Sequence, residues 1–179
     1  MNRLKDRIKE IEPVLTKEFG IDNKMALPKL LKVVVNMGIG EAYKNKELME
    51  QSKKDLMAIT GQMPQIRPAK KSVASFGIRR GVPVGLRVTL RDKRMYSFLD
   101  KLFSIVFPRL RDFRGVSLKS FDKFGNYSIG LAEHTVFPEI DITKTQPRGI
   151  EITMVITGSN QKKSKRLIEL LGLPFAKIT

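Results

Sequence analysis

The chain has 179 residues and a formal net charge of +16, and 41% of its residues are hydrophobic, which is enough for a buried core and excludes a disordered basic tail. Because it has no cysteine and a single histidine, disulfides, thiolate catalysis and cysteine-based zinc sites are excluded, and we expect neither a metal nor another cofactor. No run of about 18 apolar residues occurs and residues 1–20 are too charged for a secretion signal, so we expect a cytoplasmic protein. Its length and composition suit one domain or a tightly joined pair, and we expect a single domain over residues 1–179.

The N-terminal third predicts a helix, a strand and a second helix. The apolar residues of segment 4–15 recur at helical spacing, but Pro13 lacks an amide hydrogen and should kink or restart the helix before Gly20 ends it. Residues 31–37 then alternate as a strand with one apolar face. That apolar face is expected to consist of Leu31, Val33, Val35 and Met37. Residues 46–60 show helical spacing again and predict the second helix.

The middle of the chain predicts two strands joined by a projecting cationic loop. Residues 71–76 and 84–91 are the strand candidates, and the first is expected to begin only after Pro68, which cannot donate to a ladder. The connection, residues 77–83, contains two glycines and two arginines and is too long for a two-residue hairpin turn. We therefore expect a mobile, basic loop at this point.

The remaining elements complete an α+β pattern. Asp92 is expected to cap a helix whose apolar stripe stops before Pro108. Residues 127–131 and 150–156 alternate as two further half-polar strands, and Asn160 is expected to open the last helix. Since buried parallel strands have continuous apolar runs, the alternation indicates a largely antiparallel sheet with helices packed on one face. The predicted fold class is α+β with one open sheet face.

Half of the net positive charge lies between residues 67 and 94, where nine basic residues stand against one acid, Asp92. Each cation brought near a nucleic-acid backbone releases a condensed counterion, so this cluster favours RNA or DNA as a partner. The open face would offer charges for phosphates and amide or hydroxyl groups for bases and 2'-hydroxyls. Its expected side chains are Lys32, Asn36, Arg87, Thr89 and Arg91. The alternative interpretation is a polar face that is only solvated.

Short motifs follow one another along essentially the whole chain. They are VVVNMGIGEA (33–42), TGQ (60–62), AKKS (69–72), PRLRDFRG (108–115), KSFD (119–122), GNYS (125–128), FPEID (137–141) and LLGLPF (170–175). In order and spacing these motifs resemble large-subunit ribosomal protein five, the bacterial family that binds 5S ribosomal RNA.

The resemblance implies a structural ribosomal protein, not an enzyme, that anchors 5S rRNA in the central protuberance of the large subunit through an open concave sheet face. Positions 36, 62 and 89 match family RNA contacts. Together with nearby basic residues, the expected rRNA-binding set is Lys32, Asn36, Gln62, Lys70, Lys71, Arg87, Thr89 and Arg91. The partners implied are 5S rRNA, large-subunit rRNA and neighbouring large-subunit proteins, with no membrane.

The resemblance also implies two contacts outside the large subunit. The loop 77–83 is expected to reach transfer RNA in the P site through Arg79 and Arg80. A bridge to small-subunit ribosomal protein thirteen is expected near residues 109–115 and in the segment after Tyr127. Its expected side chains are Arg109, Arg111, Asp112 and Arg114.

Other functions account for fewer features. A free-standing RNA chaperone or regulator would show the same salt-sensitive binding and would differ only in selectivity. Residues 38–40 resemble the start of a dinucleotide-binding loop, but Tyr43 stands where a glycine is needed. Glu139 and Asp141 could hold a metal in a nuclease, yet no other acids cluster with them. His134 lacks a nucleophile, so we expect it to contact solvent or RNA.

Overall fold

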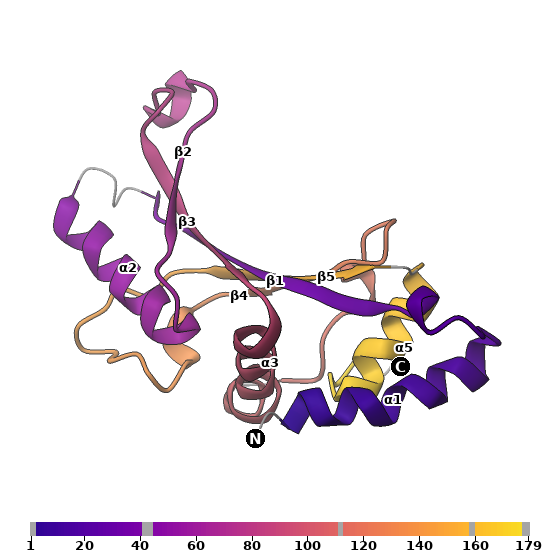
Figure 1. Ribbon diagram of the computed structural model, residues 1–179. Coiled ribbons are helices and arrows are strands. Elements are labelled where there is room, and N and C mark those ends of the chain that lie inside the picture. Colours follow the sequence, from indigo (N-terminus) through magenta and orange to yellow (C-terminus); the bar gives the residue numbers. More distant parts are fainter. Residues whose placement is uncertain (1–2, 41–44, 111–112, 158–159, 177–179) are drawn as a thin grey trace. The chain divides into compact units, whose positions relative to one another are not determined.

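A computed structural model describes residues 3–40, 45–110, 113–157 and 160–176. It shows helices and a five-stranded antiparallel open sheet with strand order β2-β3-β1-β5-β4, which confirms the predicted α+β class (Figure 1). The strands are β1 (Lys29–Gly38), β2 (Gln65–Pro68), β3 (Pro83–Leu90), β4 (Tyr127–Leu131) and β5 (Ile150–Thr157). The helices are α1 (Arg3–Phe19), α2 (Lys46–Thr60), α3 (Asp92–Lys101), the short α4 (Phe107–Arg109) and α5 (Gln161–Leu171).

The chain divides into two compact units. The first unit comprises Met1–Val33, Arg91–Ile129 and Thr153–Thr179, and the second comprises Val34–Leu90 and Gly130–Ile152. The single domain expected from the composition stays a prediction.

In the first unit, α1 packs against α3 and α5. Of the kink or restart expected at Pro13, the restart does not occur, because α1 continues through this residue as one helix. Pro13 is exposed, whereas Ile11 and Leu15 on either side of it are 5% and 1% exposed. The burial of these two side chains outweighs the one backbone hydrogen bond that the proline removes.

The helix after β3 differs from the prediction at both ends. Its N-cap residue is Arg91, in extended backbone, and α3 begins at Asp92, whose φ of 46° is left-handed, so the expected Asp92 cap is wrong. At the other end the helix continues through a π-helical turn, Leu102–Val106, into α4, which contains Pro108. The amide of Phe107 donates to the carbonyl of Leu102, five residues before it, and this wide turn ends at Val106, two residues before Pro108, which has no amide hydrogen. The predicted apolar stripe is buried as expected: Met95, Leu99, Leu102 and Val106.

The alternation in β1 holds from Val33 onward but not before it. Leu31 was expected to face inward and is 48% exposed, whereas Leu30 is buried. Leu30 lines a cavity of about 160 Å³ together with Leu15 and Leu27 of the first unit. Packing against α1, and not a strict two-residue period, therefore decides which side chain faces inward at the start of β1.

In the second unit, α2 occupies the residues predicted for it and packs against β3. The Asn45 side chain accepts a hydrogen bond from the amide of Glu47 at its start, and Gly61 ends it in the left-handed conformation. The buried side chains of this unit include Val35, Met37, Leu56, Ile59, Leu86, Val88 and Leu90.

The predicted strand 71–76 is wrong. The strand that pairs with β3 is β2, which ends at Pro68 and does not begin after it. Pro68 pairs with Pro83, and neither residue has an amide hydrogen, so the ladder stops at this pair. Beyond it the chain forms a 3-10 turn, Ala74–Phe76, and an isolated bridge between Val73 and Ile78.

Candidate nucleic-acid interface

The strands of the second unit carry polar side chains on the side opposite their buried residues. We define this outer face by Asn36 of β1, Arg87 and Thr89 of β3, and Glu151 of β5. Asn36 and Glu151 are exposed, and Arg87 and Thr89 are half-buried. The predicted alternation therefore holds at these positions, and the two β3 side chains do not point into the core.

Asn36 is held in place by its neighbours on both sides. Its Nδ2 donates to Oε2 of Glu151 at 3.4 Å. On the other side lies Gly85 of β3, where an added Cβ would stand 3.8 Å from Asn36 Oδ1 and 3.4 Å from the Met37 carbonyl oxygen. Because residue 85 is glycine, it places no side chain against the Asn36 amide, which is exposed.

Arg87 carries a donor without an acceptor. The residue pairs with Gln65 of β2, and its Nε is buried with no hydrogen-bond partner among the described residues. An unpaired buried donor costs about 1–3 kcal/mol, more when it is charged. Because Nε is buried, a phosphate oxygen would satisfy this donor only after the side chain turned outward, and guanidinium and phosphate then form strong charge-assisted hydrogen bonds.

Gln62 lies beside the outer face although it belongs to the segment after α2. Its Nε2 donates to the carbonyl oxygen of Thr89 at 3.4 Å. Gln62 and Thr89, both of which the family resemblance matches to RNA contacts, are thus neighbours in space. Lys32 and Arg91 belong to the first unit, where Lys32 is half-buried on β1 and Arg91 is exposed before α3.

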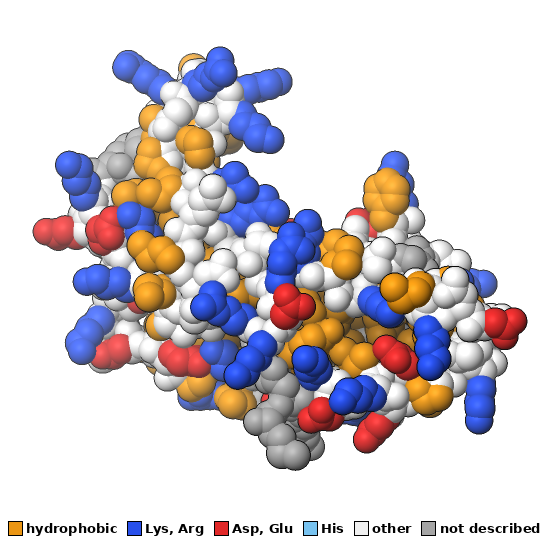
Figure 2. Space-filling view, viewed as in Figure 1, with side chains coloured by type: hydrophobic (Ala, Val, Ile, Leu, Met, Phe, Trp, Pro, Cys, Tyr) orange, Lys and Arg blue, Asp and Glu red, His pale blue; other side chains and the backbone are white. Residues whose placement is uncertain are grey.

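The connection between β2 and β3 forms a finger, which we define as residues 69–82. It lies at the tip of the β2-β3 ribbon, away from α2, and carries several Lys and Arg side chains (Figures 1 and 2). Its exposed basic residues are Lys70, Lys71, Arg79 and Arg80. The structure therefore groups the two lysines with the two arginines of the expected tRNA loop and not with the sheet face. Phe76, 74% exposed, lies in the same segment.

The finger has its own backbone hydrogen bonds. The Ala69 amide donates to the Val82 carbonyl at 2.8 Å, and the Gly81 amide donates to the Ala69 carbonyl at 3.0 Å. Nearer the tip, the Arg80 amide donates to Ser72 Oγ at 3.0 Å, and Gly77 takes the left-handed φ of 62° that a non-glycine residue would resist. These bonds hold the basic side chains on a defined backbone.

The expected bridge residues are described only in part. Arg109 ends α4 and is exposed, and Arg114 is also exposed. Arg111 and Asp112 lie outside the described residues. Residues 115 and 116 then pack against the C-terminal segment, where the Val116 amide donates to the Pro174 carbonyl at 2.9 Å.

His134 does not contact solvent, and the expectation that it would is wrong. The side chain is fully buried in the second unit, with Nε2 3.4 Å from Oδ2 of Asp55. The Arg148 amide donates to its Nδ1 at 3.1 Å. Buried polar groups need hydrogen-bond partners. The two ring nitrogens of His134 supply such partners where α2 packs against residues 134–148.

The carboxylates considered for metal binding are separate exposed groups. Glu139 and Asp141 lie in a turn and not on a strand. Hydrogen bonds from the Thr143 side chain and amide, followed by the Lys144 side chain, hold the pKa of Asp141 below its ordinary value. Over the described ranges, no group of three or more metal-binding side chains occurs. Of the helices in those ranges, none has the length and apolar character needed to cross a membrane.

One residue of the outer face was not among the expected site residues. Glu151 places a negative charge next to Asn36. Its outward position was visible in the strand alternation, but sequence alone did not show that it lies beside Asn36, 115 residues away.

Comparison with known proteins matches nearly the full length of this chain to one protein family. A family model described as ribosomal protein L5 matches residues 23–79, and a second model, described as the C-terminus of the same ribosomal protein family, matches residues 83–175. The large ribosomal subunit protein uL5 of Caldanaerobacter subterraneus is 52% identical over 179 residues, covering 99% of this chain and 100% of the relative. Proteins of the same name from Dehalococcoides mccartyi and Rubrobacter xylanophilus are 50% and 51% identical, each covering at least 98% of both chains.

Proposed function

Because the chain belongs to the ribosomal protein L5 family, whose members are structural and non-enzymatic constituents of the large ribosomal subunit, we propose that its outer face binds 5S ribosomal RNA. The observation that carries the proposal is Arg87 on the polar outer face: its guanidinium is positively charged, and its buried Nε has no hydrogen-bond partner among the described residues. Asn36, Gln62 and Thr89 would orient the RNA through directional hydrogen bonds, while Lys and Arg supply salt-dependent attraction. The set of contacts proposed also includes Lys32 and Arg91.

The finger is proposed to contact transfer RNA in the P site. Four exposed cations on a hydrogen-bonded backbone suit a phosphate surface, and the exposed Phe76 adds an apolar contact. We assign Arg79 and Arg80 to this contact, with Lys70 and Lys71 beside them. Arg109 and Arg114 are exposed, which is compatible with the proposed bridge to small-subunit ribosomal protein thirteen.

The 5S proposal is tested by the affinity of the full chain for a 5S rRNA transcript at several salt concentrations. Arg87→Ala should weaken binding about tenfold or more, because it removes a charge-assisted contact. Lys54→Ala is the matched control: it removes one positive charge from an exposed position on α2 and should change affinity about twofold at most. Circular dichroism of both variants should stay native.

Two outcomes would contradict the proposal. Unchanged affinity of Arg87→Ala for the 5S transcript would show that the outer face is not the surface that binds 5S rRNA. Equal affinity of the unmodified chain for 5S rRNA and for unrelated hairpins at every salt concentration would instead favour an RNA chaperone.

A further inference from the structure

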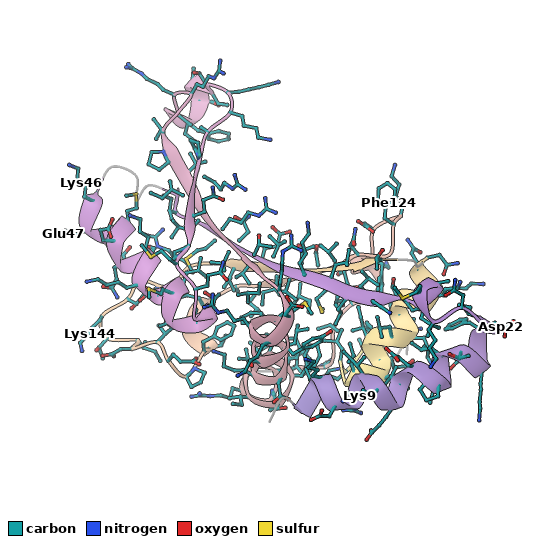
Figure 3. The ribbon with its side chains drawn as sticks, in the orientation of Figure 1. Lys9, Asp22, Lys46, Glu47, Phe124 and Lys144 are labelled. Carbon is teal, nitrogen blue, oxygen red and sulfur yellow. The ribbon has the colours of Figure 1, made fainter. Side chains whose placement is uncertain are left out.

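The loop that precedes β4 presents an aromatic side chain to solvent. Phe124 is 67% exposed, and in Figure 3 it lies at the tip of this loop and points away from the strands. The loop, residues 121–126, belongs entirely to the first unit and shares no residue with the outer face or the finger. An exposed phenyl ring at a loop tip is a candidate contact because its burial against a partner is favourable.

The backbone beneath Phe124 is held by one carboxylate. Asp122 Oδ1 accepts hydrogen bonds from the amides of Phe124 at 2.9 Å and Asn126 at 2.8 Å, and Oδ2 accepts from Asn126 Nδ2 at 2.7 Å. Desolvation acts to raise the pKa of Asp122, but the hydrogen bonds from Asn126, Phe124 and Gly125 outweigh it and the pKa lies below its ordinary value. The carboxylate is therefore ionised at neutral pH and already engaged by its own loop.

The loop is also tied to neighbouring elements. Gln161 Nε2 at the start of α5 donates to the Asp122 carbonyl at 3.0 Å. Asn126 Oδ1 accepts from the Ile156 amide of β5 at 3.1 Å. Since the loop is ordered by its own hydrogen bonds, a partner that binds its tip has little backbone entropy to remove.

The charge at the tip distinguishes between possible partners. Lys123 Nζ lies 5.4 Å from the centroid of the Phe124 ring, and Lys119 is exposed in the 3-10 turn, Leu118–Ser120, that precedes the loop. A protein pocket that enclosed the ring would have to desolvate the neighbouring ammonium group, which is unfavourable without an acid to pair with it. A nucleotide meets both groups at once, because its base offers a face for stacking and its phosphate accepts from the ammonium group.

We propose that Phe124 stacks on an unpaired base of ribosomal RNA while Lys123 contacts an adjacent phosphate. The inference rests on the proposed function only in taking RNA as the surrounding partner, because the loop is a separate site. Stacking of one base on one aromatic side chain accounts for roughly five- to 150-fold in affinity.

A single tryptophan can report this contact because the chain contains none. In the Phe124→Trp variant, single-stranded oligoadenylate should quench tryptophan fluorescence strongly, and a blunt RNA duplex of equal length should quench it much less. Ile142→Trp, at a position 71% exposed in the second unit, is the matched control and should show little quenching by either RNA. Absence of quenching at position 124, or equal quenching at both positions, would overturn the proposal.

Crosslinking in assembled large subunits distinguishes an RNA partner of position 124 from a protein partner. A benzophenone-containing amino acid at position 124 should crosslink to a ribosomal RNA nucleotide on irradiation. A crosslink only to a ribosomal protein, or none at all, would overturn the assignment. If Arg87→Ala leaves 5S affinity unchanged while the RNA crosslink at 124 forms, the outer-face proposal fails and the loop proposal stands.

Discussion

Nε2 of His134 and the carboxylate of Asp55 lie 3.4 Å apart, although 79 residues separate them in the sequence. The Arg148 amide donates to Nδ1 at 3.1 Å, and with Nδ1 as the acceptor it is the hydrogen on Nε2 that faces Asp55. Asp55 also accepts from Gln51 Nε2 at 2.8 Å. The pair joins α2 to the segment after β4 within the second unit.

Asp55→Ala should lower the free energy of unfolding by about 2–4 kcal/mol, because it leaves the buried His134 and the Gln51 amide without their acceptor. Urea unfolding followed by circular dichroism measures the change. Glu50→Ala, an exposed acid on the same helix, is the control and should cost less than about 1 kcal/mol. Equal stability of the two variants would show that the His134 contact contributes nothing.

Arg79→Ala combined with Arg80→Ala should speed tRNA release from the P site about two- to tenfold, as expected for two exposed phosphate contacts. Affinity for 5S rRNA should stay within about twofold, since the finger is separate from Asn36 and Arg87 on the outer face. Ribosomes that carry the variant protein allow both measurements. A comparable loss of 5S binding would argue against two separate sites.

Gly115→Ala should destabilise the C-terminal segment by about 2 kcal/mol or more. The added Cβ would stand 2.5 Å from the backbone nitrogen of Ala176, and the φ of 99° is strained for alanine. Gly130→Ala is the matched control, because nothing lies within 4 Å of its added Cβ. Amide exchange at Ala176, which donates to the Val116 carbonyl at 3.0 Å, should accelerate only in Gly115→Ala.

Alkaline pH should weaken the first unit through Tyr127. Burial raises the pKa of its phenol from 10.0 to about 12, and the hydroxyl donates to the Ser117 carbonyl at 2.7 Å. The folded state thus binds the proton more tightly than the unfolded state, so this stabilisation is complete below pH 10 and is lost as pH rises toward 12. The loss is at most about 2–3 kcal/mol.

The Tyr127→Phe variant isolates this effect from the titration of the lysines. Its stability should fall less steeply than that of the unmodified chain between pH 10 and 12, as measured by urea unfolding at each pH. Parallel curves for the two proteins would contradict the assignment of the pH dependence to Tyr127.

Elements whose determinants lie within a few residues were predictable. The bounds of α2 follow from a capping Asn45 and a terminating Gly61, and those of α5 from Asn160 and Gly172. The alternation of apolar and polar residues likewise sufficed to predict β4 and β5, because side chains on successive strand residues point to opposite faces.

The candidate site was predictable by type of residue and by face, but not by contact. Strand alternation placed Asn36 and Thr89 on a polar side, and the structure agrees. It could not show that Gln62 reaches Thr89 or that Arg87 Nε is buried without an acceptor, because each depends on how neighbouring strands and loops are paired.

The amino-acid order alone determined the fold class, the family and most element bounds, since these depend on local periodicity, caps and short motifs. The tertiary structure decided the strand that pairs with β3, the continuation of α1 through Pro13 and the burial of His134. In each case the outcome depends on a partner distant in sequence, whose packing or hydrogen bonding outweighs the local preference.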